Sequence, residues 1–103
     1  MPKPPDDDAA RLDEACVALA ATPARLRTLR VVMDGGDVTA KDVMEALGLT
    51  RSAVGYHLAA LTEAGLIHER RATHPRGRGP IIYWSADREA IHDLIDTLNK
   101  HLT

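Results

Sequence analysis

The clearest hydrophobic pattern in the chain lies in residues 39–66, where apolar residues recur at the spacing of two successive helices. The first group consists of Val43, Ala46 and Leu47, an i, i+3, i+4 set that forms one helix face. The second group consists of Val54, Leu58 and Leu61, which form a stripe on a longer helix. We therefore predict a short helix followed by a longer one, each with its apolar face turned inward.

Polar residues and glycines mark where these two helices begin and end. Thr39 can cap the first helix, and Asp42 follows three residues later, where a carboxylate suits the helix dipole. Gly48 stands where the first helix must end, because glycine adopts a left-handed backbone without steric cost. Thr50 supplies a hydroxyl cap for the second helix, and Gly65 closes it. This layout predicts a helix-turn-helix.

The outward face of the longer helix carries small and hydrogen-bonding side chains. Helical geometry, at about 100° per residue, places these residues opposite the apolar stripe. They are Ser52, Tyr56, Ala59 and Glu63, with Arg51 and Gly55 at the edge. Small residues allow close approach to a groove, while arginine and serine can bind base edges or phosphates. The alternative is an ordinary surface helix of an all-helical bundle.

A predicted hairpin follows the two helices. Segment 66–71 has strand character, segment 73–79 is rich in turn residues, and segment 80–85 returns as a strand rich in β-branched and aromatic residues. Glycines and prolines surround Arg76 and Arg78, which indicates an exposed and basic loop. A helix-turn-helix followed directly by a basic hairpin has the layout of a winged helix.

The chain resembles the ArsR-type winged helix-turn-helix transcriptional regulators in the run GDVTAKDVMEALGLTRSAVGYHLAALTEAGLIHERR and in the later GRGPIIYW. The upstream ATPARLRTLRVVMDGG is similar to the helix that precedes the motif in that family. The resemblance implies a mainly α fold with a small β-hairpin, in the order α-α-α-α-β-β-α. It also implies a prokaryotic, sequence-specific regulator of transcription, expected to be a repressor. The residues expected to contact double-stranded DNA are Thr50, Arg51, Ser52, Gly55, Tyr56, Ala59, Arg71, Arg76 and Arg78.

Three further helices are predicted outside the motif. The first spans Ala9–Ala21, and the second begins at Pro23, because proline suits the first helical position. The second helix is expected to end at residues 34–36, and the last helix spans Asp87–Leu102. Residues 1–8, rich in proline and aspartate, are predicted to be a disordered acidic arm.

The two terminal helices carry apolar stripes that are long for so small a domain. Such stripes need a partner surface, and in the resembled family the first and last helices pair across a two-fold axis. We therefore expect a homodimer that binds a palindromic operator, with half-sites about one helical turn apart. The alternative is that both stripes cover the chain's own core. The residues expected at the dimer interface are Leu12, Cys16, Leu19, Ile91, Leu94, Ile95, Leu98 and Leu102.

Composition limits the size and the setting of the protein. With 103 residues, the chain is long enough for one modest domain, which we expect over residues 9–103. The hydrophobic content of 45%, with 3% aromatic residues and no Phe, predicts an aliphatic core. The single cysteine excludes an internal disulfide, and no segment resembles a signal peptide or a membrane span. A cytoplasmic location is therefore expected.

The net charge of −2 is unusual for a DNA-binding protein, but the charges are unevenly distributed. Residues 15–30 contain three arginines and no acid, while residues 50–84 contain five arginines against two acids. The acids gather in the N-terminal arm, the first motif helix and the last helix. A basic face on an acidic body can still attract phosphates, because the local field matters more than the total charge.

Metal sensing is an alternative function that the resemblance raises. Family members that sense arsenic have a Cys-x-Cys pair where this chain has Thr39 and Lys41, so that thiol site is absent. Other members bind zinc between paired C-terminal helices. The candidate ligands of this chain there are His92, Asp96 and His101. Because Ala90 replaces an expected aspartate and tetrahedral zinc needs four ligands, we predict no metal and no cofactor.

Two other reactive side chains have ordinary structural explanations. Cys16 is expected to be a small buried hydrophobe. His57 is expected to pack or to form a local hydrogen bond on the inner flank of the longer helix, which would be the recognition helix of the predicted motif. No phosphate loop, carboxylate pair or nucleophile motif is present, so no enzyme activity is predicted. The remaining alternative is a winged helix that binds only proteins, which would lack the steep salt dependence of DNA binding.

Overall fold

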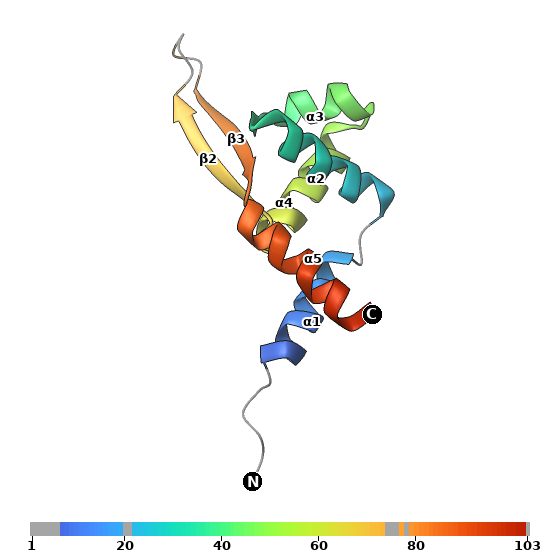
Figure 1. Ribbon diagram of the computed structural model, residues 1–103. Coiled ribbons are helices and arrows are strands. Elements are labelled where there is room, and N and C mark those ends of the chain that lie inside the picture. Colours follow the sequence, from blue (N-terminus) through green and yellow to red (C-terminus); the bar gives the residue numbers. More distant parts are fainter. Residues whose placement is uncertain (1–6, 20–21, 74–76, 78, 103) are drawn as a thin grey trace.

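The computed structural model describes residues 7–19, 22–73, 77 and 79–102 (Figure 1). The described elements, in chain order, are α1 (Asp7–Leu19), α2 (Pro23–Gly35), β1 (Asp37–Val38), α3 (Ala40–Leu47), α4 (Arg51–Glu63), β2 (Ile67–Thr73), β3 (Pro80–Ala86) and α5 (Arg88–Leu102). A mainly helical body carries a β-hairpin that extends away from it. The predicted winged helix-turn-helix fold is therefore confirmed.

Helix α1 differs slightly from its predicted bounds, whereas the bounds of α2 agree with the prediction. Helix α1 begins at Asp7, two residues earlier than predicted, so only residues 1–6 of the predicted arm lie outside the described residues. The predicted last residues of this helix, 20–21, also lie outside them. Helix α2 continues through Gly35 and is capped by Gly36, whose φ is 78°.

The ends of the helix-turn-helix follow the predicted capping chemistry. The Thr39 side chain accepts from the Asp42 N–H at 3.2 Å, while the Asp42 carboxylate accepts from the Thr39 N–H at 2.9 Å. These two bonds form a capping box at the start of α3. Gly48 ends α3 in the left-handed region, with φ of 65°. Thr50 caps α4, and Gly65 follows that helix with φ of 77°.

The sheet contains a short third strand that the sequence pattern did not predict. Its strand order is β1-β3-β2, with antiparallel pairing throughout. Val38 of β1 lies opposite Trp84 of β3. A strand of two residues has too few positions for an alternating pattern, and its partner lies far along the chain. The hairpin of β2 and β3 is thereby joined to the segment between α2 and α3.

Arg70 connects the outer strands of this sheet. It lies on β2 opposite Tyr83 of β3, and its guanidinium carbon is 4.9 Å from the Tyr83 ring centroid. Its Nη2 also lies 3.3 Å from the Asp37 carboxylate on β1. A cation over an aromatic face and an ion pair both restrict this side chain. Arg70 therefore contributes to the base of the wing.

The hydrophobic core lies where α2, α3, α4, the base of the sheet and the start of α5 meet. The side chains of Val43, Val54, Leu58 and Leu61 are buried, as predicted. The other buried residues of this cluster are Leu29, Val32, Val38, Leu66, Ile67 and Ile91. Within the described ranges, no helix combines the length and the apolar character needed to cross a membrane.

Ala46 is exposed, so its predicted place on the inner face of α3 is wrong. The buried face is centred nearer to Ala40, Val43, Met44 and Leu47, all of which pack on or within the core. At about 100° per residue, Ala46 lies well outside that arc. Met44 packs against the core on the inner face, where the sequence pattern had predicted Ala46.

Candidate nucleic-acid interface

Helix α4 has two faces of opposite character, as its sequence pattern predicts. Its inner face is buried, and its outer face exposes all the predicted DNA-contact residues of this helix. These are Arg51, Ser52, Gly55, Tyr56 and Ala59. Thr50 is also exposed, and its hydroxyl oxygen accepts from the N–H of Ala53 at 3.2 Å. The structure therefore brings six predicted residues to one surface, while their contact with DNA stays a prediction.

Gly55 has no role in the packing of α4. A Cβ atom placed at this residue would meet nothing within 4 Å. Glycine in a helix interior costs about 0.5–1 kcal/mol relative to alanine. No neighbouring atom in the fold requires a glycine here. Because Gly55 has no side chain, another molecule can approach the helix backbone closely at this position of the outer face.

Tyr56 projects from the outer face and contacts two other side chains. It is 67% exposed, yet the guanidinium carbon of Arg25 lies 5.3 Å from its ring centroid. The His57 ring lies edge-on at a centroid distance of 5.7 Å. Arg25 comes from α2, so the Tyr56 ring is contacted from a neighbouring helix. Sequence reasoning missed Arg25 as a neighbour of this surface, and only its place in a basic segment singled it out.

His57 is buried on the inner flank of α4, as predicted. Burial lowers the pKa of His57 from its ordinary value, and the positive charge of Arg25 lowers it further. Its Nδ1 is buried and has no hydrogen-bond partner among the described residues. Near pH 7 the ring is therefore neutral, which allows it to lie close to the guanidinium without repelling it.

The wing contributes one described arginine to the candidate interface. Arg71 on β2 is exposed, and its Nε lies 3.8 Å from the carboxylate of Glu69, a weak surface pair. The neighbouring Arg70 is restricted by its contacts within the sheet. Arg76 and Arg78, predicted to contact DNA from the basic loop of the hairpin, lie outside the described residues.

The two terminal helices lie side by side at one end of the molecule (Figure 1). The predicted dimerisation stripe of α5 divides between two environments. Ile91 is buried and Leu94 is half-buried against the core, so both serve the chain's own packing. Ile95 is 57% exposed and Leu102 is 80% exposed, and Leu98 is half-buried between them.

Helix α1 uses a different residue than predicted to pack against the body of the chain. Ala15 is buried, while Leu12 is half-buried and Cys16 is exposed. The expected burial of Cys16 is therefore wrong for the single chain, because the neighbouring Ala15 takes the inward position. Val17 is also exposed. The Leu19 side chain, predicted for the dimer interface, lies outside the described residues.

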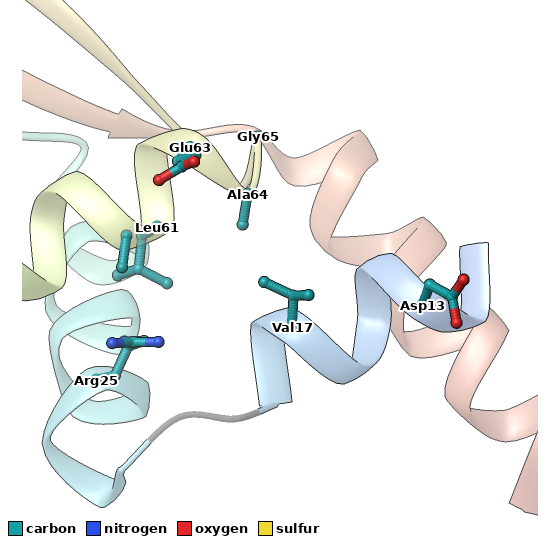
Figure 2. Close-up of a pocket in the computed structure, with 8 residues that line it drawn as sticks. Asp13, Val17, Arg25, Leu61, Glu63, Ala64 and Gly65 are labelled. Carbon is teal, nitrogen blue, oxygen red and sulfur yellow. The ribbon is translucent and has the colours of Figure 1, made fainter. Parts of the chain in front are cut away.

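A cavity of about 530 Å³ lies between α1, α2 and the end of α4 (Figure 2). Figure 2 shows Arg25 of α2 beneath Leu61 of α4, across the gap from Val17 of α1. The cavity carries acidic groups from Asp13 and Glu63 as well as the Arg25 cation. It therefore has no uniform charge that would favour one class of ligand.

Two of the three candidate metal ligands of α5, His92 and Asp96, form an ordinary surface pair. Nδ1 of His92 lies 3.3 Å from the Asp96 carboxylate, one helical turn away, and both side chains are exposed. In the part of the chain that the structure describes, no group of three or more His, Cys, Asp or Glu residues could hold a metal ion. The absence of a metal site in the assembled protein stays a prediction.

Known proteins resemble this chain in sequence over more than half of its length. A model of the MarR family matches residues 22–78. The transcriptional repressor SdpR of Bacillus subtilis (strain 168) is 31% identical over 72 residues, which are 67% of this chain and 73% of SdpR.

Solved structures resemble this chain over most of its length. The crystal structure of a possible transcriptional regulator for arsenical resistance has a TM-score of 0.70 and 27% identity, covering 88% of this chain and 85% of that one. An ArsR-like transcriptional regulator from Rhodococcus sp. RHA1 has a TM-score of 0.71 and 24% identity, covering 92% and 82%. NolR from Sinorhizobium fredii has a TM-score of 0.67 and 22% identity, covering 97% and 94%. The sequence identities of the last two structures are low, so these two show a shared fold and carry no conclusion about function.

Proposed function

Because the chain belongs to the MarR family, we propose that it is a sequence-specific repressor that binds double-stranded DNA as a homodimer. The observation that carries this proposal is the two-faced α4. Its inner side is anchored in the core, while Arg51, Ser52 and Tyr56 are exposed on its outer side. A helix held in this way can enter a major groove while its packing in the core stays intact.

Known relatives support the regulatory part of the proposal. The predicted resemblance to winged helix-turn-helix regulators is confirmed, with the MarR family as the family whose model matches and ArsR-like proteins among the similar structures. The chain is a transcriptional regulator of the winged-helix type. SdpR is a transcriptional repressor, which supports repression as the direction of regulation here. The cytoplasm, where bacterial DNA is accessible, is the proposed location.

The exposed apolar residues of the terminal helices support the homodimer. Ile95 and Leu102 on α5 and Val17 on α1 are large apolar side chains that the single chain leaves in solvent. Pairing across a two-fold axis would bury the same surface of both subunits. Such a dimer would place its two α4 helices in major grooves about one helical turn apart, and it would therefore favour a palindromic operator.

The salt dependence of duplex binding tests this function. A protein that neutralises six or more phosphates should lose about 10³-fold or more in affinity between about 50 mM and 200 mM salt. Binding isotherms on an operator selected from random duplexes, and on a scrambled duplex, would measure both affinity and specificity. Weak binding with a flat salt response on every duplex would favour the alternative, a winged helix that binds only proteins.

Changing Gly55 to alanine should have opposite effects on stability and on DNA binding. We expect Gly55→Ala to raise the free energy of unfolding by about 0.5–1 kcal/mol, because alanine favours the helix and its Cβ meets no neighbour. The added methyl group should weaken operator binding by about 1–3 kcal/mol if the groove packs against this position. Thermal unfolding and binding isotherms on the same sample would measure both effects. A more stable protein with unchanged operator affinity would contradict the placement of Gly55 at the interface.

A further inference from the structure

Arg25 is held at the start of α2 by local backbone contacts. Thr22 caps this helix, and its hydroxyl oxygen accepts from the Arg25 N–H at 3.3 Å. The same N–H lies 3.0 Å from the Thr22 carbonyl oxygen, and Pro23 fixes the backbone between them. The Arg25 side chain therefore leaves the backbone from a fixed point next to α4.

The guanidinium group of Arg25 lies over the Tyr56 ring. Its carbon lies 5.3 Å from the ring centroid, within the range of cation–π attraction. Its Nε is buried and has no hydrogen-bond partner among the described residues. A guanidinium that has lost part of its hydration gains more from an aromatic face than a fully solvated one does. The contact between Arg25 and Tyr56 is therefore favoured over a free, hydrated arginine.

Tyr56 is restricted at its ring although it remains exposed. Arg25 covers one part of the ring, and His57 lies edge-on with an interplanar angle of 68°. His57 is itself buried and cannot move aside freely. A tyrosine without such neighbours would rotate among several side-chain conformations and lose that freedom on entering a groove. Here part of that loss has already occurred in the free protein.

We propose that Arg25 is a positioning residue that holds the Tyr56 ring in the orientation with which it contacts the operator. The inference rests on the proposed function, because Tyr56 must contact DNA for its orientation to matter. Arg25 thereby contributes to sequence discrimination from a helix outside the helix-turn-helix. Its effect passes through Tyr56, in contrast to an arginine that binds a phosphate and strengthens binding to every duplex.

A double-mutant cycle on Arg25 and Tyr56 tests the inference. Arg25→Gln removes the charge and keeps most of the side-chain length. We expect it to weaken operator binding about three- to tenfold for each subunit, with the salt dependence and the affinity for scrambled duplex unchanged. In a Tyr56→Ala background, Arg25→Gln should have no further effect. Arg25→Lys should restore part of the operator affinity, because a lysine cation can also contact the ring.

Arg27→Gln is the matched control, because Arg27 lies in the same helix and is exposed. It removes the same charge and leaves the neighbours of Tyr56 in place, so operator discrimination should remain. Equal losses on operator and scrambled duplex with Arg25→Gln, or an undiminished loss in the Tyr56→Ala background, would overturn the positioning role. Those results would identify Arg25 as a direct phosphate contact.

Duplex binding by the wild type and by Arg25→Gln distinguishes a wrong positioning role from a wrong proposed function. If the wild-type protein binds no duplex in a salt-dependent manner, the proposed function fails. If the wild type binds its operator and Arg25→Gln binds it equally well, only the positioning role fails. Thermal unfolding of each variant separates either result from loss of the fold, and Arg25→Lys serves as the second variant if Arg25→Gln is unstable.

Discussion

Ile95→Asp should leave the chain folded and prevent it from forming a dimer. Ile95 is 57% exposed in the single chain, so a charge there disturbs little of the core. In a two-fold dimer, the substitution occurs twice, and the burial of each aliphatic side chain is worth about 1.5–3 kcal/mol. The dimer dissociation constant should therefore rise by about 10²- to 10⁴-fold. Operator affinity should fall strongly as well, because a monomer binds only one half-site.

Sedimentation equilibrium over a range of concentrations would measure the dimer constant, and circular dichroism would check the fold. Ile95→Leu is the matched control, because it keeps an apolar side chain of the same size and should retain the dimer. A monomeric wild type would refute the dimer itself. An unchanged dimer with Ile95→Asp would place the interface elsewhere, with Ile95 outside it.

Arg51→Ala should remove most of the sequence discrimination while sparing binding to random duplex. Arg51 is exposed at the first position of α4, and the start of a recognition helix is the part that contacts base edges. A bidentate arginine–guanine contact is worth about 1–3 kcal/mol, and a dimer makes this contact in both half-sites. The free energy of operator binding should therefore become less favourable by up to about 6 kcal/mol over the two half-sites.

Two comparison variants make the result of Arg51→Ala specific. Arg51→Lys keeps the charge but loses the planar fork, so it should keep the affinity for scrambled duplex and lose operator preference. Arg71→Ala removes an exposed cation of the wing. It should lower the affinity for the operator and for the scrambled duplex by the same factor. It should also reduce the salt slope by about one unit for each phosphate that the variant no longer neutralises. If Arg51→Ala had no effect and Arg71→Ala altered base preference, the recognition helix would be assigned wrongly.

Local chemistry explains why the helix-turn-helix could be predicted from the sequence. The capping box of Thr39 and Asp42 and the left-handed Gly48 depend on residues within a few positions of each other. The buried stripe of α4 follows from helical period alone. The short strand β1 could not be predicted, because Val38 pairs with Trp84 and nothing local marks either residue for that pairing.

Which residues of the terminal helices and of α4 are exposed, and what they contact, depends on tertiary packing. These features were therefore predicted less completely from the sequence. The stripe of α5 is continuous in sequence, but the body of the chain covers Ile91 and leaves Ile95 exposed. Cys16 has the same helical spacing as a buried residue, yet Ala15 faces inward. The contact between Arg25 and Tyr56 exists only because α2 packs against α4, and no sequence period connects the two residues.

The pairing of β1 with β3 has a consequence for how this protein folds. Because Val38 meets Trp84, the sheet closes a long chain loop that contains α3, α4 and β2. Closing such a loop costs chain entropy before the distant contact forms, which slows folding relative to a bundle with only local contacts. The recognition helix therefore lies inside a segment whose two ends are tied together. Its local unfolding should be coupled to the opening of the sheet, so the helix and the base of the wing should gain and lose protection from hydrogen exchange together.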